Sequence, residues 1–187
     1  MNPKRYLPAI LILAIAAFFA INRLYPGKTS HPSGRDMPQV PMTKDAGQDH
    51  NNPENQRRMA IFHYNEGNKF LRQENWSEAV RNYEMSLRHN QDIPDIHINL
   101  STAQLRARTF DKAYETLKTL QEKNPNHPAL FYNLACYYAL TSQIDPAWES
   151  LQNAVTLGFK NIAAIKTDPD LAPLRNDPRY AEWIKNR

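Results

Sequence analysis

The sequence predicts an all-α protein in which three helical hairpins of equal length stack on one another behind a single transmembrane helix. Two observations predict the stack. Glycine is scarce, with five among 187 residues and only Gly67 and Gly158 after residue 50, which argues against turn-rich β folds and glycine-loop nucleotide sites. The second part of the chain also repeats with a period of 34 residues, which is typical of stacked supersecondary units.

The first element is residues 6–22, a stretch of seventeen uncharged residues with basic residues on both sides. This length is at the lower limit for a helix that crosses a bilayer, about 17–25 residues. A cleaved signal peptide shares this pattern, but bulky Phe18 lies just ahead of a possible cleavage after Ala20, where a small residue is usual. We predict that residues 1–25 form an uncleaved signal anchor.

The second element is a linker over residues 26–53. It contains five prolines, three glycines and polar runs such as GQDHNNPENQ. Such a composition cannot bury enough apolar surface to offset the entropy lost on ordering. We predict a flexible spacer with a root-mean-square reach of roughly 30 Å.

The repeat that follows is defined by equivalent residues at intervals of 34. Ala79, Ala113 and Ala147 set the register. Other aligned sets are Trp76, Phe110 and Ile144; Tyr83, Leu117 and Leu151; and Asn65, Asn99 and Asn133. With this register we expect helices over 54–73, 76–89, 94–107, 110–123, 127–141, 144–157 and 178–186. Residues 160–175 should form turns and one small helix.

Local signals support these helix bounds. Asn75 followed three residues later by Glu78 forms a capping box, which is typical of a helix start. Asp145 and Asp177 each precede a proline, a combination that caps a helix and places proline at its first position. Gly158 suits the end of the helix over 144–157.

Residues 57–187 resemble tetratricopeptide repeat proteins. The first repeat, FHYNEGNKFLRQENWSEAVRNYEMSL, has a small and an aromatic residue at Gly67 and Phe70, and then Ala79 and Tyr83, in the pattern of that family. The second and third repeats match less fully, within the ordinary variation of the family. The resemblance implies a right-handed solenoid of helical hairpins.

The resemblance divides the module into three repeats over 54–158 and a capping segment over 159–187. The final segment, GFKNIAAIKTDPDLAPLRNDPRYAEWIK, resembles one that closes many bacterial arrays of this kind. A repeat stack needs a cap on its last apolar face. Four apolar residues are expected to cover that face: Leu171, Leu174, Tyr180 and Trp183.

Residues with catalytic or metal-binding chemistry do not gather in any known pattern. His63 and His97 occupy the same repeat position, which favours structural histidines, and no HExxH or Cys/His spacing occurs. The single cysteine, Cys136, has no nearby cation or base in the sequence. We therefore expect no enzyme activity, no cofactor, no metal site and no small-molecule substrate.

The charge pattern also argues against a nucleic-acid partner. The net charge is +4, of which Lys4, Arg5 and Arg23 supply +3 near the amino terminus. Charges of both signs alternate over the rest of the chain, whereas a nucleic-acid domain usually concentrates basic residues on one face.

The resemblance implies that the first helices of the hairpins line a concave groove for a protein or peptide. The register assigns to it Tyr64, Asn65, Asn68, Leu71 and Arg72 from the first repeat, Ile98, Asn99, Thr102, Leu105 and Arg106 from the second, and Tyr132, Asn133, Cys136 and Leu140 from the third. The asparagines at 65, 99 and 133 resemble a ladder that holds the backbone of an extended peptide. Alternatively, these amides satisfy polar contacts between helix pairs.

These expectations combine into a membrane-tethered scaffold or adaptor that binds a protein or peptide. The alternative is an accessory subunit of a membrane-associated enzyme or secretion machine, packed permanently against its partner. A short basic start before an anchor resembles bacterial envelope proteins. We therefore expect a single-pass protein of the bacterial inner membrane with the repeat module on the outer side.

Overall fold

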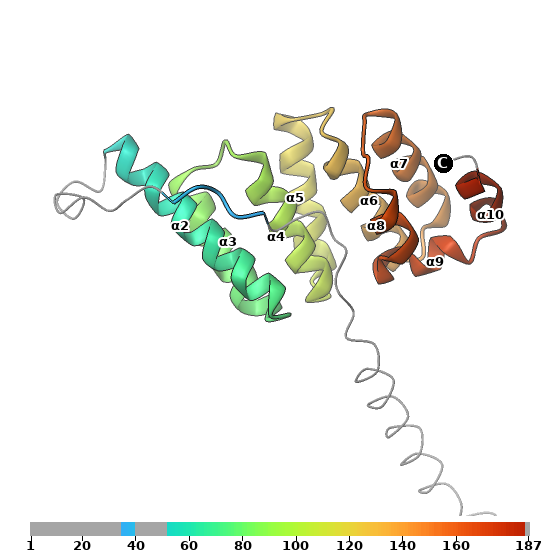
Figure 1. Ribbon diagram of the computed structural model, residues 1–187, viewed down its shortest axis with the longest axis horizontal. Helices are drawn as coiled ribbons and strands as arrows, with labels where there is room; N and C mark the ends of the chain where they lie inside the picture. Colours follow the sequence, from blue (N-terminus) through green and yellow to red (C-terminus); the bar gives the residue numbers. More distant parts are fainter. Residues whose placement is uncertain (1–34, 40–51, 186–187) are drawn as a thin grey trace, which may run out of the picture.

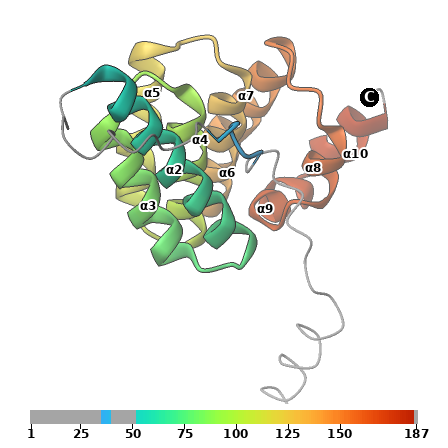
Figure 2. The same cartoon turned by 60° about the vertical axis from the view of Figure 1, so that its left-hand side comes forward.

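The computed structural model describes residues 35–39 and 52–185, and the regular elements there are helices, with no strand among them. Three helical pairs follow one another along the chain. The pairs are α2 (Pro53–Arg72) with α3 (Trp76–His89), α4 (Pro94–Arg106) with α5 (Phe110–Lys123), and α6 (Pro128–Leu140) with α7 (Ile144–Thr156). Figures 1 and 2 show the pairs side by side in a curved row. The predicted helical repeat is confirmed for the described residues.

The bounds of these six helices agree with the predicted bounds within one residue, because local signals set them. Asn75 Oδ1 accepts from the backbone N–H of Glu78 at 3.4 Å at the start of α3. Gly158 follows α7 with a φ of 102°. The predicted cap at Asp145 is wrong, since α7 begins at Ile144, and Asp145 instead pairs with Arg179 at 2.8 Å.

The closing segment contains more helix than predicted. Its elements are α8 (Ile162–Thr167), the 3-10 helix η3 (Pro169–Leu171), α9 (Ala172–Arg175) and α10 (Pro178–Lys185). The additional helix start comes from Asp168, whose carboxylate accepts from the backbone N–H of Asp170 at 3.0 Å. Asp168 precedes Pro169 as Asp177 precedes Pro178, so the same signal that predicts α10 also marks η3.

The closing segment packs on the apolar face of the third pair. Leu171 and Leu174 are buried in one cluster with Trp148 of α7. Tyr180 and Trp183 pack on the same cluster, and the ring of Trp183 meets Trp148 edge-on with centroids 5.6 Å apart. This packing removes from water the surface that would otherwise end the stack.

The predicted anchor over 6–22 lies outside the described residues. The predicted linker also lies outside them, except for residues 35–39, 52 and 53. No helix within 52–185 is both long enough and apolar enough to cross a membrane.

Where the two helices of each pair cross, a small residue of the first helix faces a larger residue of the second. In the first pair a Cβ atom on Gly67 would lie 2.6 Å from Cε1 of Tyr83, so only glycine fits opposite the tyrosine ring. The equivalent residues of the other pairs are Ser101 with Leu117 and Ala135 with Leu151, all of them buried. A larger residue in the first helix therefore accompanies a smaller residue in the second.

Gly67→Ala should destabilise the fold, because the new methyl group overlaps the ring of Tyr83. Overpacking costs about 1–3 kcal/mol, against a gain of about 1 kcal/mol from the helix propensity of alanine. The double variant Gly67→Ala/Tyr83→Leu reproduces the residue pair of the third repeat and should lose less than the sum of the single losses. Urea unfolding followed by circular dichroism measures both, and additive losses would contradict the volume match.

Candidate functional site

Residues 35–39 lie as an extended segment across α2. Figure 1 shows this segment in blue, crossing α2 toward α4, and Figure 2 shows it from a second side. The backbone N–H of Met37 donates to Asn65 Oδ1 at 2.8 Å, and Asn65 Nδ2 donates to the carbonyl of Met37 at 2.8 Å. One carboxamide therefore satisfies both main-chain groups of one residue.

Asp36 adds a charged contact beside this backbone pair. Arg72 donates from Nη1 and Nη2 to the two carboxylate oxygens of Asp36, at 3.2 and 3.4 Å. Asn68 Nδ2 donates to Asp36 Oδ1 and to the carbonyl of Arg35, both at 3.2 Å. The side chains of Arg72 and Asp36 are 52% and 50% exposed, so water screens the pair, and its contribution stays below about 1 kcal/mol.

The three side chains that hold the segment form one stripe on α2. Asn65, Asn68 and Arg72 are spaced by three and four residues and therefore lie on the same face of the helix. Met37 is partly buried against an apolar cluster that includes Tyr64 and Leu71. The stripe and the cluster together form the surface that we call the α2 site.

A buried hydrogen-bond network fixes the orientation of Asn68 in this site. The hydroxyl of Tyr83 and Nδ2 of Asn99 both donate to Asn68 Oδ1, at 2.7 and 2.9 Å. Asn99 Nδ2 also donates to the hydroxyl of Tyr64 at 3.0 Å. Burial raises the pKa of Tyr64 to about 12 and raises that of Tyr83 further, so both phenols stay protonated. Because its oxygen is engaged inside, Asn68 turns its N–H groups toward the segment.

Asn133 lies in a contact between helix pairs. Its Nδ2 lies 3.0 Å from the carbonyl of Ile98 and within 3.1 Å of the hydroxyl oxygens of Ser101 and Thr102, and the side chain is fully buried. These bonds join α6 to α4. Asn99 similarly joins α4 to α2, whereas Asn65 contacts the segment 35–39 outside the repeat.

Asn133→Ala should lower the free energy of unfolding by about 1–3 kcal/mol, because it removes buried hydrogen bonds between two pairs. Asn65→Ala serves as the matched variant and should cost less than about 1 kcal/mol, since its partner segment is largely exposed. Urea unfolding of both variants tests the difference. Equal losses would show that the two asparagines have the same role.

The closing segment contacts residues of the second and third repeats that are predicted to line the groove. Arg106 Nη2 donates to Asp168 Oδ1 at 2.8 Å, and Arg106 Nε lies 3.1 Å from Asp170 Oδ2. The hydroxyl of Tyr132 donates to Asp168 Oδ2 at 2.8 Å, and Arg175 donates to the carbonyl of Asp168 at 2.6 Å. Asp168 is fully buried. Part of the predicted groove is therefore occupied by the chain itself.

Cys136, Asp168 and Asp170 are the one group of possible metal ligands in the described part of the chain, with ligand atoms within 4.8 Å of one another. Their chemistry does not fit a metal site. Burial raises the pKa of the Cys136 thiol, which therefore stays protonated. Both carboxylates already pair with Arg106, so the group is an ion-pair cluster.

Asp170 should make stability depend on pH. Burial raises its pKa from 3.8 to about 6, while Arg106 opposes that rise and Asp168 adds to it. Between about pH 4 and 6 the folded chain holds this proton and the unfolded chain has released it. Stability should therefore fall as pH rises through this window, by at most about 3 kcal/mol. Asp170→Asn should remove this fall in urea unfolding measured across the window, and an unchanged pH profile would contradict the assignment.

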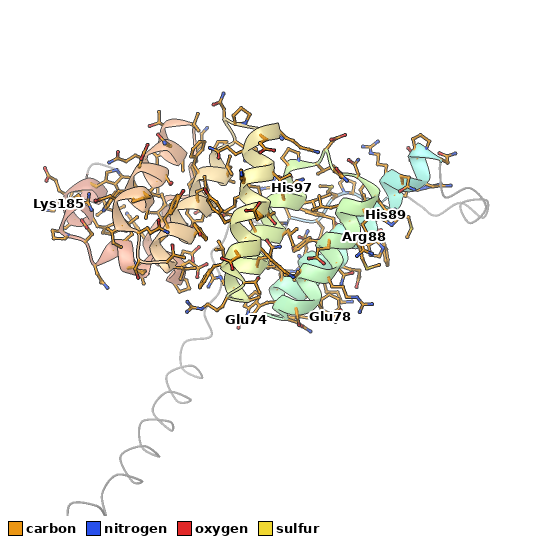
Figure 3. The ribbon with its side chains drawn as sticks, turned by 180° about the vertical axis from the view of Figure 1, so that it is seen from behind. Glu74, Glu78, Arg88, His89, His97 and Lys185 are labelled. Carbon is orange, nitrogen blue, oxygen red and sulfur yellow. The ribbon has the colours of Figure 1, made fainter. Side chains whose placement is uncertain are left out.

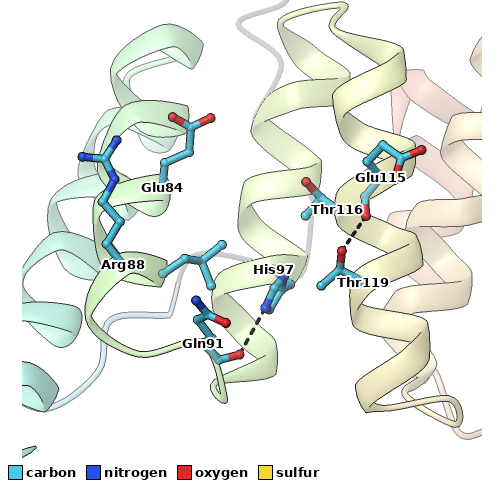
Figure 4. Close-up of a pocket in the computed structure, with 8 residues that line it drawn as sticks. Glu84, Arg88, Gln91, His97, Glu115, Thr116 and Thr119 are labelled. Atoms are coloured by element: carbon cyan, nitrogen blue, oxygen red, sulfur yellow. Dashed lines mark hydrogen bonds between the residues drawn. The ribbon is translucent and has the colours of Figure 1, made fainter.

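A cleft of about 360 Å³ lies away from the α2 site, between α3 and α5. Figure 4 shows Glu84 and Arg88 on one wall, Glu115 and Thr119 on the other, and His97 between them, and Figure 3 shows the same side from farther away. His97 Nε2 contacts the carbonyl of Gln91 at 3.2 Å, and burial lowers its pKa. His97 thus has a structural partner. The walls carry charges of both signs and select no single ligand class.

The structure places the predicted groove residues in three settings. All of them except Arg72, Arg106 and Leu140 are buried. Three form or adjoin the stripe that holds the segment: Asn65, Asn68 and Arg72. Buried contacts within or between the pairs hold Ile98, Asn99, Thr102 and Asn133. The closing segment contacts Arg106 and Tyr132.

The sequence pattern does not predict the acidic partners of the two arginines, which are Asp36 for Arg72 and Asp168 and Asp170 for Arg106. Asp36 lies in a stretch whose composition predicts only a linker. Asp168 carries a recognisable signal, since it precedes a proline as Asp177 does. That signal predicts a cap and says nothing of the contact with Arg106.

The comparison with known families supports the repeat. A tetratricopeptide repeat model matches residues 70–135, from the end of α2 into α6. The match includes the whole of α3, α4 and α5. No curated protein matches the chain. The helical pairs of the structure agree with this match over residues 70–135.

Proposed function

We propose that this chain is a membrane-tethered adaptor that binds an extended segment of a partner protein at the α2 site. Tetratricopeptide repeats generally mediate interactions between proteins, and the family is typically a non-enzymatic scaffold. The partner segment would lie where residues 35–39 now lie.

The pair of hydrogen bonds between Asn65 and the main chain of Met37 carries this proposal. Both bonds go to backbone groups, which every residue except proline offers equally. A site that recognises backbone in this way fixes the main chain of an extended segment, while the apolar cluster contacts the side chain separately. This property suits an adaptor.

The strength of binding follows from the size of the surface. The apolar cluster around Tyr64 and Leu71 supplies about 25 cal/mol for each Å² that a partner buries there, before ordering costs reduce the total. Hydrogen bonds to the backbone mainly orient the segment. We therefore expect weak binding to a single short peptide.

The membrane tether is the part of the proposal that rests on sequence alone. Residues 6–22 are uncharged and follow Lys4 and Arg5, as in a signal anchor. We propose a place in the bacterial inner membrane with the repeats on its outer side. If the protein is instead a permanently packed accessory subunit, it should copurify with one partner at fixed stoichiometry after detergent extraction.

Peptide selection tests the proposed binding. The target is a variant of the full chain in detergent micelles, Asp36→Lys/Met37→Pro, which we call the vacated chain. Lysine at position 36 repels Arg72, and proline at position 37 has no N–H for Asn65. Peptides selected from a random library should bind the vacated chain and lose at least about tenfold in affinity when Asn65→Ala is added.

The control is Gln152→Ala, which removes an exposed carboxamide from α7. This variant should bind the selected peptides as the vacated chain does. A selection without binders, or binders that respond equally to both substitutions, would refute a binding role for the α2 site.

A further inference from the structure

The α2 site holds a specific pair of residues, and this pair indicates which partner it selects. We infer that the site takes extended segments in which an acidic residue directly precedes an apolar residue, and that Asp36 and Met37 are an internal copy of that pair which a partner displaces. This inference rests on the proposed function and adds the chemistry of the partner.

The acidic position is defined by the groups that contact the Asp36 carboxylate, which are all hydrogen-bond donors. Arg72 presents two N–H groups to the carboxylate of Asp36, and Asn68 presents a third. The oxygen of Asn68 is already engaged by Tyr83 and Asn99, so the carboxamide cannot turn to accept from a basic residue without breaking both buried bonds. A lysine in place of Asp36 would face a cation and an N–H donor.

The apolar position is defined by burial. Among residues 35–39 only Met37 is partly buried, and the other four are exposed. Met37 packs on the cluster of Tyr64 and Leu71 while its backbone pairs with Asn65. The same residue is therefore fixed by its main chain and selected by its side chain.

A second arginine of the repeat also contacts an acidic residue that is followed by an apolar one. Arg106 lies 34 residues after Arg72 and occupies the same repeat position. It pairs with Asp168 at 2.8 Å and with Asp170 at 3.1 Å, and the residue after Asp170 is the buried Leu171. An acidic residue followed by an apolar one thus meets an arginine of the same register in both places.

The two occupied places differ in burial, and that difference makes the first one exchangeable. Asp168 and Asp170 are buried where the closing segment packs against α4 and α6, whereas the ion pair of Asp36 with Arg72 is half exposed. Twelve residues join Gln39 to Asn52, and so short a connection gives the segment an effective concentration on the order of millimolar. A partner segment that makes additional contacts can bind tightly enough to compete with the tethered residues 35–39.

A labelled peptide tests the pair of residues and its displacement. The probe is Ser-Gly-Arg-Asp-Met-Pro-Gln-Val-Pro, the sequence of residues 33–41, with fluorescein at one end, and anisotropy measures its binding to the full chain in detergent micelles. It should bind the vacated chain at least about tenfold more tightly than the original chain. Replacing its aspartate by lysine, or its methionine by serine, should each weaken binding at least about fivefold.

The outcomes separate this inference from the proposed function. If library peptides bind the vacated chain but this probe does not, or if the lysine probe binds equally, the acidic–apolar pair is refuted and the binding site stands. Equal binding to the original and vacated chains would refute displacement.

Two further measurements address other roles of the segment. Light scattering should give the same oligomeric state for both chains, because a dimer lost in the vacated chain would mean that residues 35–39 bind a second copy. The melting temperature should change little. A fall of more than about 8 °C would mean that the segment is a fixed cap of α2 rather than an exchangeable occupant.

Discussion

The matched volumes of Gly67 and Tyr83 at the first helix crossing are the constraint on which the α2 site depends. Because glycine leaves room, the tyrosine ring enters the crossing and its hydroxyl reaches Asn68. That bond turns the N–H groups of Asn68 toward residues 35–39. In the other pairs leucine replaces tyrosine, and the residues equivalent to Asn68 are Thr102 and Cys136. The packing of one helix pair therefore decides where a polar binding surface can form.

The asparagine that recurs every 34 residues makes two kinds of contact. Asn99 and Asn133 each donate to groups on the preceding first helix, which tightens the stack. Asn65 belongs to the first described pair, and its carboxamide binds the extended segment instead. The interpretation as a link between helix pairs thus applies to Asn99 and Asn133. Contact with an extended backbone applies to Asn65 alone of the three. The carboxamide can serve either purpose because it offers a donor and an acceptor together.

The sequence predicts the helices well because their bounds depend on nearby residues, such as Asn75 with Glu78, and on a period of 34. It also predicts which residues lie on the first helices, because the period of 34 residues relates equivalent positions in the three repeats. It cannot predict what each of them contacts. The partner of Asn65 lies 28 residues away in a stretch of linker composition, and that of Arg106 lies 62 residues away in the closing segment. Such contacts depend on how separate segments meet in three dimensions, which no local signal specifies.

The degree of burial determines whether each arginine–aspartate pair stabilises the fold or can separate. Removing one partner of a buried pair leaves an uncompensated charge, so Arg106 and Asp168 should stay together throughout the life of the folded chain. The pair of Arg72 and Asp36 is half exposed, and water can solvate either partner when they separate. The same residue types at the same repeat position therefore form a buried contact with the closing segment and a solvated contact at the α2 site. The proposed exchange of residues 35–39 for a partner segment depends on this difference in burial.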